Sequence, residues 1–513
     1  MTHDLVPPSR GIDTADEIAA LTAVRPSARQ LAWQSMEFYA FIHFGMNTMT
    51  DREWGVGGED PALFDPSGLD VDQWMATIAA AGMTGAILTA KHHDGFCLWP
   101  SRATTHSVAA SGWQDGKGDL VRLVADSARG HRLRFGIYLS PWDRTESTYG
   151  SGQAYDDFFV RQLEELLSDY GEVFSVWFDG ANGEGPCGPH QRYDWERYYA
   201  VVRRLQPGAV ISVCGPDVRW CGNEAGHTRP DEWSVVPAAL RDAERIVDRS
   251  QHIDNGTFSQ LVRSDEEDLG SRAALAGRLN ELVWFPAEVN TSIRPGWFYH
   301  PSEDDSVRSA DELFELWCGA VGGNACLLLN VPPDPHGLVA APDVVALTDL
   351  GERIRAFRDA ALAVDVVVSS GAVRTPEGGP VDDPSTLARL AGDATAPYVW
   401  RPEVSDAVPR VLLVLASPTG VGAVVVREDL AQGQRLERVV VIGVADGREE
   451  VLAEANSVGY QRILRFPPRV VGEVMVRIEA SRGLPAIRTV AVVGASGAQQ
   501  PGRPVGCPRD QYT

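Results

Sequence analysis

The sequence has almost no lysine, and its acidic residues far outnumber its basic ones. Lys91 and Lys117 are the only lysines among 46 basic residues, and 70 acidic residues bring the formal charge to −24. A surface of this sign repels the phosphates of nucleic acids and the headgroups of anionic lipids. We therefore expect neither nucleic acid nor membrane as a partner, and we favour a neutral small substrate.

The sequence also lacks a paired cysteine motif and a long apolar run. Its seven cysteines are an odd number without any CxxC pair, which argues against a disulfide framework and against a zinc cluster. The first residues contain no basic segment leading into an apolar run, and no later run is long enough to span a bilayer. The chain as it stands is expected to be cytoplasmic, with secretion as the alternative if a leader has been removed. These patterns leave the oligomeric state undecided.

Short apolar strands and amphipathic helices alternate over residues 1–360. Strands are expected at 38–45, 85–90, 134–140, 173–178, 209–214, 281–290 and 325–331, and helices at 71–82, 119–130, 155–170, 192–206, 309–319 and 342–357. This alternation predicts parallel strands joined by right-handed crossovers. The expected fold class is therefore α/β, with a TIM-like (β/α) barrel as the catalytic domain over residues 1–360.

The pattern changes after residue 360. Short β-branched runs, such as those at 364–368, 410–416, 422–426 and 488–494, are separated by Gly, Pro and Asp turns and show little helical periodicity. Several short strands at close spacing are typical of an antiparallel sandwich. We predict an all-β C-terminal domain over residues 361–513.

Polar and aromatic side chains recur where the expected strands of the barrel end. The polar ones are His43, His92, His93, Tyr138, Asp179 and Asn330, with Glu224 in the loop after the fifth strand, and the aromatic ones are Trp54, Trp99, Trp142, Trp177, Trp220 and Trp297. Any one of them alone is better explained as a core residue or a cap. Together they suit a sugar, because hydroxyls need donors and acceptors while C–H faces pack on rings. Their recurrence at the catalytic end of a barrel predicts a carbohydrate site.

A metal site is the competing interpretation. His43, His92, His93, Asp94 and Asp179 could be the ligands of a barrel metallohydrolase. However, the first strand carries no His-x-His pair, and adjacent histidines on an extended segment point to opposite sides. We therefore expect no metal and no other cofactor.

Several long motifs resemble glycoside hydrolase family 29, the α-L-fucosidases. They are FIHFGMNTMTDREWG (41–55), TAKHHDGFCLWPS (89–101), GIYLSPWD (136–143), VWFDG (176–180), GNEAG (222–226), EVNTSIRPGWFYH (288–300) and GGNACLLLNVPPD (322–334). The GNEAG and EVNTSIRPGWFYH segments further resemble the subgroup that cleaves α-1,3 and α-1,4 fucosyl linkages on branched, Lewis-type oligosaccharides. The resemblance implies a retaining exo-α-L-fucosidase whose partner is a fucosylated oligosaccharide or glycoconjugate.

The resemblance also implies roles for individual residues. Asp179 would be the nucleophile and Glu224 the general acid/base, which matches the two carboxyl groups that a retaining glycosidase needs. The residues implied in sugar binding are His43, Glu53, Trp54, His92, His93, Tyr138 and Trp177, with Glu288, Arg294 and Trp297 at the rim or the aglycone subsites. The C-terminal domain is expected to support packing, in preference to forming a second sugar site.

Some alternatives stay open at the level of sequence. Glu232 and Asp217 lie close enough to Glu224 in the chain to be the acid/base instead. A fucosidase of broad specificity, acting also on α-1,2 and α-1,6 linkages, is the main alternative function. A metal-dependent barrel hydrolase and a fucose-binding protein without turnover are the others.

Overall fold

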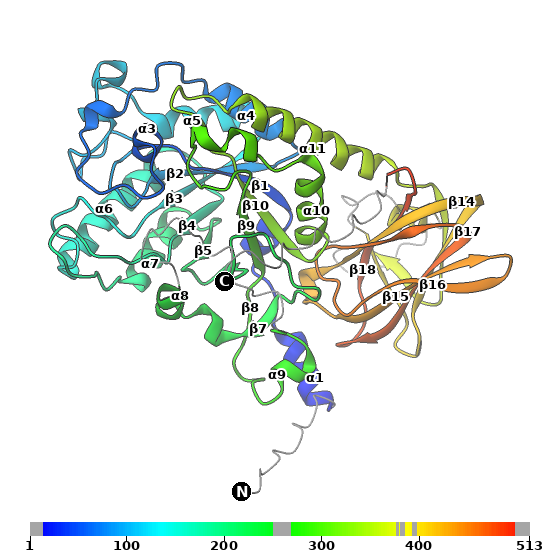
Figure 1. Ribbon diagram of the computed structural model, residues 1–513. Coiled ribbons are helices and arrows are strands. Elements are labelled where there is room, and N and C mark those ends of the chain that lie inside the picture. Colours follow the sequence, from blue (N-terminus) through cyan, green and yellow to red (C-terminus); the bar gives the residue numbers. More distant parts are fainter. Residues whose placement is uncertain (1–13, 250–267, 376–378, 380–384, 392–397, 498–513) are drawn as a thin grey trace, which may run out of the picture.

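The computed structural model describes residues 14–249, 268–375, 379, 385–391 and 398–497, and its larger part is a parallel barrel (Figure 1). Eight strands form the barrel sheet in the order β5-β4-β3-β2-β1-β10-β9-β6. They are β1 (Phe38–Ile42), β2 (Gly85–Lys91), β3 (Arg134–Leu139), β4 (Ser175–Phe178), β5 (Val210–Val213), β6 (Arg219–Trp220), β9 (Ala287–Ser292) and β10 (Ala325–Asn330). A parallel bridge between Ser212 and Val218 brings β5 beside β6, so the sheet nearly closes. The predicted TIM-like fold class is confirmed.

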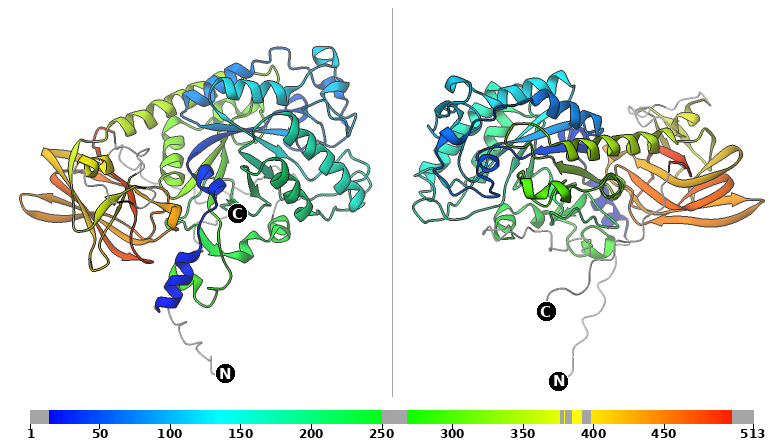
Figure 2. Two further views of the ribbon diagram at one scale, coloured as in Figure 1. Left: turned by 180° about the vertical axis from the view of Figure 1, so that it is seen from behind. Right: turned by 45° about the horizontal axis from the view of Figure 1, so that its top comes forward.

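The barrel strands are continuous apolar runs because helices cover their outer face. Every residue of β1, β2, β4 and β5 is buried, as expected for a parallel sheet covered on both sides. The surrounding helices are α4 (Val71–Ala80), α5 (Leu120–Gly130), α6 (Gln153–Asp169), α7 (Trp195–Leu205), α10 (Ala310–Ala320) and α11 (Ala341–Asp359) (Figure 2). Smaller helices are α1 (Ala15–Ala23), α2 (Ala28–Gln34), α3 (Met46–Thr50), α8 (Ala243–Arg249), α9 (Arg272–Leu275) and α12 (Ser385–Ala388).

The segment expected as one strand at 281–290 is two strands in different sheets. β8 (Leu282–Trp284) pairs with β7 (Val235–Pro237) in a separate antiparallel sheet, whereas β9 belongs to the barrel. Pro286 lies between them and has no N–H to donate to a ladder, which interrupts the pairing.

The C-terminal part is an antiparallel, all-β structure, as predicted. Its strands are β11 (Val364–Val368), β12 (Ala372–Arg374), β13 (Val399–Arg401), β14 (Arg410–Glu428), β15 (Leu436–Ala445), β16 (Arg448–Ala455), β17 (Arg462–Ser481) and β18 (Ile487–Gly494). The runs at 410–416 and 422–426, expected as separate strands, are parts of β14. This strand has register shifts opposite β17 between Val414 and Thr419 and between Val421 and Ala423. Such bulges bend a strand while it stays paired, so the two expected strands are one long strand in the structure.

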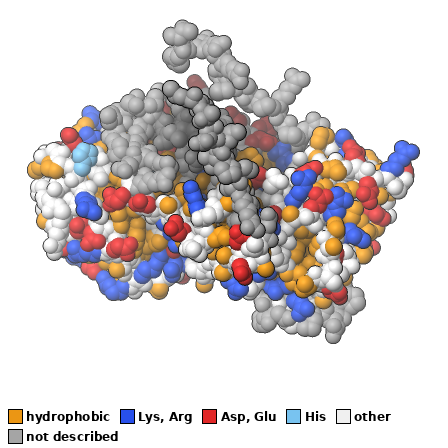
Figure 3. Space-filling model, turned by 90° about the horizontal axis from the view of Figure 1, so that it is seen from below, with side chains coloured by type: hydrophobic (Ala, Val, Ile, Leu, Met, Phe, Trp, Pro, Cys, Tyr) orange, Lys and Arg blue, Asp and Glu red, His pale blue; other side chains and the backbone are white. Residues whose placement is uncertain are grey.

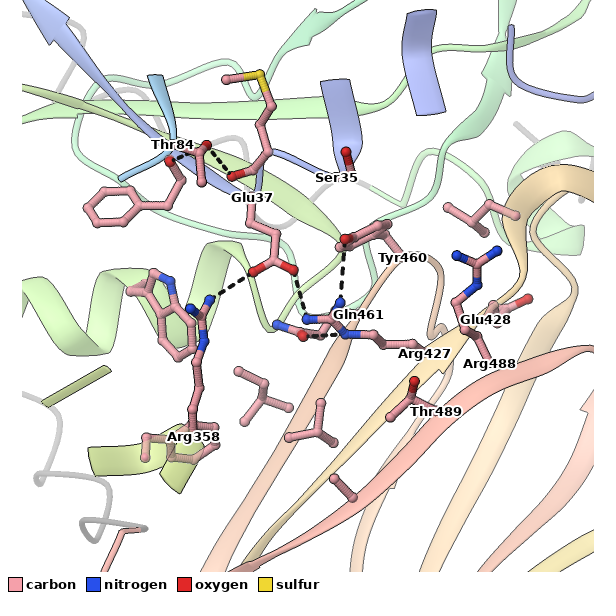
Figure 4. Close-up of a pocket in the computed structure, with 18 of the residues that line it drawn as sticks. Ser35, Glu37, Thr84, Arg358, Arg427, Glu428, Tyr460, Gln461, Arg488 and Thr489 are labelled. Carbon is pink, nitrogen blue, oxygen red and sulfur yellow. Dashed lines mark hydrogen bonds and ion pairs between the residues drawn. The ribbon is translucent and has the colours of Figure 1, made fainter. Parts of the chain in front are cut away.

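A cavity of about 690 Å³ lies between the start of β1 and the C-terminal sheet (Figure 4). The Glu37 carboxylate lies in it and accepts hydrogen bonds from Arg427 of β14 (2.7 Å) and from Arg358 at the end of α11 (3.1 Å). Because each carboxylate oxygen meets a different guanidinium group, Glu37 joins the barrel to β14 and α11.

The surface carries charges of both signs. On the face shown in Figure 3, acidic and basic side chains are interspersed with apolar ones. No helix within the described ranges has the length and apolar character needed to cross a membrane. The six cysteines in these ranges are free thiols, and Cys507 lies outside them.

Candidate active site

A cavity lies at the C-terminal ends of the barrel strands. Nine of the predicted site residues line it: Asp179, Glu224, His43, Trp54, His92, His93, Tyr138, Trp177 and Trp297. Phe41, Gly180, Ala181, Val213, Trp220 and Asn290 complete its wall. Residues separated by more than two hundred positions in the chain meet there because parallel strands all end at the same edge of the barrel.

Asp179 follows β4 and is held by two donors. Tyr138 donates its hydroxyl proton to Oδ2 and the backbone N–H of Ala181 donates to Oδ1, each at 2.8 Å. The side chain remains 23% exposed, and Nε2 of His93 lies 4.0 Å from Oδ2. Burial raises the pKa of Asp179 above its ordinary value, and the hydrogen bonds from Ala181 and Tyr138 oppose that rise. The result is an oriented carboxylate that keeps lone pairs for a ligand.

Glu224 reaches the same cavity from the loop that follows β6. It is half-buried, and the loop around it is held in place by Asn223, whose side-chain oxygen accepts a hydrogen bond from the backbone of His227 at 3.0 Å. A backbone bridge also ties Ala225 to Thr291 of β9. One acid thus follows a barrel strand and the other lies in a loop, so the two occupy different surroundings.

The two rival acids are in buried ion pairs and do not line the cavity. Glu232 lies between Arg219 and Arg229, with 3.2 Å to the latter. Burial acts to raise the pKa of Glu232, but the two guanidinium groups outweigh it and hold the pKa below its ordinary value. Asp217 pairs with Arg29 (3.3 Å) and Arg203. An acid paired with two arginines is poorly suited to giving up and recovering a proton.

Burial favours the neutral form of the three histidines of the cavity. Burial lowers the pKa of His43 to about 3 and lowers the pKa values of His92 and His93 well below the ordinary value. In each ring Nδ1 has a protein partner: Asn330 for His43 (2.8 Å), Asn47 for His92 (3.2 Å) and Ser140 for His93 (2.7 Å). Each ring therefore keeps Nε2 for a ligand, and a neutral imidazole suits a hydroxyl group.

Aromatic rings form much of the remaining wall. The indole of Trp177 packs against Phe41 at 5.2 Å and Tyr138 at 5.4 Å between ring centroids. Trp297 packs against His43 at 5.2 Å, and Trp54 against His93 at 5.4 Å. Rings that contact one another hold flat apolar faces in place beside polar groups, which is the combination that sugar rings need.

Glu53, one of the residues predicted to bind substrate, lies behind the cavity wall. Its carboxylate accepts hydrogen bonds from the backbone N–H groups of Trp297 (3.1 Å) and Phe298 (3.2 Å) and pairs with His300 at 2.8 Å. The hydrogen bond to Glu53 raises the pKa of His300 to about 9. Glu53 therefore contacts the segment that carries Trp297, and the structure does not place it on the wall.

Glu288 and Arg294 are also away from the wall, although a rim position was expected for both. Glu288 is completely buried inside the barrel, behind Trp177. Arg294 is buried in an ion-pair network with Asp343 of α11 and with Asp304, the latter at 2.9 Å. The guanidinium group of Arg294 thus ties the segment after β9 to α11.

Trp220, one of the aromatic residues expected at the strand ends, is on the cavity wall, and so is Asn290, which was not predicted. Trp220 donates its indole N–H to the side-chain oxygen of Asn290 at 2.8 Å. Asn290 follows Glu288 by two positions on β9, so the two side chains share a face of the strand. Polar residues at every second position, 288, 290 and 292, of a segment predicted as a buried strand were the signal in the sequence.

Within the residues that the structure describes, no group of three or more His, Cys, Asp or Glu side chains is arranged to hold a metal ion. His92 and His93 both line the cavity, with ring centroids 4.0 Å apart, so the expectation that these adjacent histidines point to opposite sides is wrong.

Lys91 and Asp94, which flank the two histidines, are both buried. The Lys91 ammonium pairs with Asp143 at 2.8 Å, and burial raises the pKa of Asp94 to about 7.

The comparison with known proteins gives the family. Residues 59–357 match the family model for α-L-fucosidase. The chain belongs to the α-L-fucosidase family. It is 36% identical to a rice protein described as putative alpha-L-fucosidase 1, over 90% of this chain and 83% of the rice protein. As a member of this family it is a glycoside hydrolase that removes α-linked L-fucose.

Solved structures of other α-L-fucosidases have the same architecture. A putative α-L-fucosidase from Bacteroides ovatus is 38% identical, with a TM-score of 0.78, over 97% of this chain and 79% of that one. A glycoside hydrolase family 29 fucosidase from Ruminococcus gnavus, solved in complex with fucose, is 26% identical with a TM-score of 0.77, over 93% of this chain and 96% of that one.

Proposed function

We propose that this α-L-fucosidase works by a retaining double displacement, with Asp179 as the nucleophile and Glu224 as the general acid/base. One observation carries the proposal. Among the described residues, Asp179 and Glu224 are the only acidic side chains on the cavity wall. A retaining glycosidase needs two carboxyl groups flanking the scissile bond, about 5–5.5 Å apart, one ionised and one protonated.

The steps assign each group a task. Asp179 attacks the anomeric carbon from the β face while Glu224 gives its proton to the departing oxygen, which leaves a β-fucosyl-enzyme. Glu224, now ionised, takes a proton from a water molecule. That water attacks from the α face, the bond to Asp179 breaks, and α-L-fucose leaves. Donors from Tyr138 and Ala181 favour the ionised form of Asp179 between turnovers.

The neutral groups of the wall would bind the fucose ring. His43, His92 and His93 each keep one ring nitrogen for a hydroxyl, and the indoles of Trp54, Trp177 and Trp297 would enclose the C–H faces and the C6 methyl group. The R. gnavus relative was solved in complex with fucose, which supports fucose as the sugar that this family binds.

The retaining mechanism predicts the configuration of the first product. With an aryl α-L-fucoside, the fucose released first is expected to be the α anomer, because two inversions restore the original configuration. Proton NMR, recorded before mutarotation equilibrates the anomers, measures this. The β anomer as first product would show a single displacement and would overturn the proposal.

We further propose selectivity for α-1,3 and α-1,4 linkages on branched oligosaccharides. The two motifs that suggest this subgroup form one part of the wall. Glu224 comes from residues 222–226, Asn290 and Trp297 come from residues 288–300, and the bridge between Ala225 and Thr291 joins the two segments. The side chains that would contact the aglycone therefore come from the two segments, 222–226 and 288–300, that resemble the α-1,3/1,4-selective subgroup.

The linkage proposal predicts a preference between two classes of substrate. Fucose release from Lewis-type trisaccharides is expected to exceed release from 2′-fucosyllactose by a factor of about 100 in kcat/KM, which corresponds to a few hydrogen bonds and one stacking contact. The ratio is measured from the initial rates of fucose release at matched substrate concentrations. Hydrolysis of an aryl α-fucoside serves as the control that the enzyme is active. Equal rates would favour the broad-specificity alternative.

A further inference from the structure

A carboxylate that the mechanism does not use is completely buried behind the cavity wall. Glu288 of β9 is 0% exposed, and its two oxygens accept hydrogen bonds from the indole N–H of Trp177 (2.8 Å) and from the hydroxyl of Tyr39. Trp177 lines the cavity, whereas Glu288 and Tyr39 do not. Glu288 is thus one contact away from the wall.

Trp177 also connects Glu288 to the proposed nucleophile, Asp179. Trp177 and Asp179 are two positions apart at the end of β4, so their side chains leave the chain on the same side. The Trp177 ring packs on Tyr138, which donates to Asp179 at 2.8 Å. A shift of the Trp177 indole would therefore change the shape of the cavity wall. It would also move the Tyr138 hydroxyl that orients Asp179.

The hydrogen bonds around Glu288 favour its ionised form. The hydroxyl of Tyr39 accepts a hydrogen bond from the indole of Trp33 at 2.9 Å, so its own proton is free to go to Glu288. A proton added to the oxygen facing Trp177 would meet the indole N–H. A proton added to the oxygen facing Tyr39 would leave the Tyr39 proton without an acceptor. Either position loses a buried hydrogen bond, which is unfavourable.

We propose that Glu288 is a positioning residue: its ionised carboxylate holds the indole of Trp177 in place, so that the affinity of the cavity for fucose depends on the charge of Glu288. This inference rests on the proposed role of the cavity wall in sugar binding. Glu288 itself touches no substrate.

The surroundings of Glu288 place its titration near neutral pH. Burial raises the pKa of Glu288 to about 7, against the lowering effect of the hydrogen bonds from Tyr39 and Trp177. The other titratable groups that act on it are the Tyr39 hydroxyl of β1 and the Cys326 thiol of β10. Burial raises the pKa values of both, so they are uncharged near neutrality. Trp220, its register partner on β6, has no titratable group. Glu288 is thus ionised above about pH 7 and protonated below, and the affinity for fucose should fall as the pH falls.

Most other groups at the cavity do not titrate in this range. The three histidines have lowered pKa values and stay neutral, and His300, with a pKa of about 9, stays charged. Asp94, with a pKa of about 7, is the competing group, because it adjoins His93 in the chain. On the cavity wall itself, the pKa of the Asp179 carboxyl group is also raised, and Glu224, the proposed acid/base, is the second carboxyl group there.

The first experiment measures fucose binding by calorimetry in an Asp179→Asn background, which removes the titration of the nucleophile. Between about pH 8 and about pH 6, the affinity is expected to fall by a factor of about 10, the size of one lost buried hydrogen bond. Adding Glu288→Gln should give weak binding at both pH values, because an amide reproduces the hydrogen bonding of the protonated acid. Asp94→Asn is the matched control and should keep the pH dependence. The inference would be overturned if the pH dependence of fucose affinity disappeared in the Asp94→Asn variant and persisted in the Glu288→Gln variant.

The second experiment observes Trp177 directly in the wild-type enzyme. Its indole N–H resonance, assigned by its loss in Trp177→Phe, should shift with pH with a midpoint of about 7. Tyr39→Phe removes a donor to the carboxylate and should move the midpoint upward, whereas Glu288→Gln should abolish the shift. An indole resonance that does not respond to pH would overturn the inference. If Trp177→Phe leaves fucose affinity unchanged, the proposed sugar-binding role of the wall fails instead.

Discussion

Asp179→Ala is expected to lower kcat/KM for an aryl α-L-fucoside by a factor of about 10⁴ or more, as expected when a covalent nucleophile is removed. The alanine leaves the hydroxyl of Tyr138 and the N–H of Ala181 aimed at an empty position. Added azide should enter that position and attack from the β face. The product should be the β-fucosyl azide, with inverted configuration, and its stereochemistry can be read by NMR.

Glu184→Ala is the matched control for the loss of Asp179. Glu184 is exposed on the segment that follows β4 and does not line the cavity, so its removal should leave turnover near the wild-type rate. Calorimetry with fucose should show that Asp179→Ala still binds the sugar. Turnover near the wild-type rate in Asp179→Ala would contradict its assignment as nucleophile.

Glu224→Ala is expected to lower kcat/KM for a natural glycan by a factor of about 10³, the range of general acid catalysis, and to lower it much less for an aryl fucoside with a good leaving group. An activated leaving group departs without a proton, so the first step survives. Asp179 still forms the β-fucosyl-enzyme, and azide can then replace the water that Glu224 would have activated. The rescued product should be the α-fucosyl azide, with retained configuration. The two variants therefore predict opposite anomers from the same added nucleophile.

Glu232→Gln tests the rival assignment. It breaks a buried ion pair with Arg219 and Arg229, so thermal unfolding at a lower temperature is expected. Azide should not restore any lost activity, because Glu232 is not on the cavity wall. If azide restored the activity of Glu232→Gln and not that of Glu224→Ala, Glu232 would be the acid/base in place of Glu224.

Local patterns predicted the barrel because its strands are buried on both sides. β2, β3 and β10 begin at the expected residues, since continuous apolar runs mark such strands clearly. β6 was missed because two residues are too short to show any period. The long β14 was divided into two, since its bulges put turn-forming residues inside a strand that remains paired.

The sequence by itself determined which residue types stand at the ends of the barrel strands, because a strand and the turn after it are local features of the chain. Only the tertiary structure decided which acids reach the cavity. Glu224 lines it, whereas Asp217 and Glu232 are in ion pairs with arginines. It also decided that Glu288 lies beneath Trp177. The physical reason is that these outcomes depend on partners brought together by folding: Glu288 and Trp177 are 111 positions apart, and no pattern within one segment records such a contact.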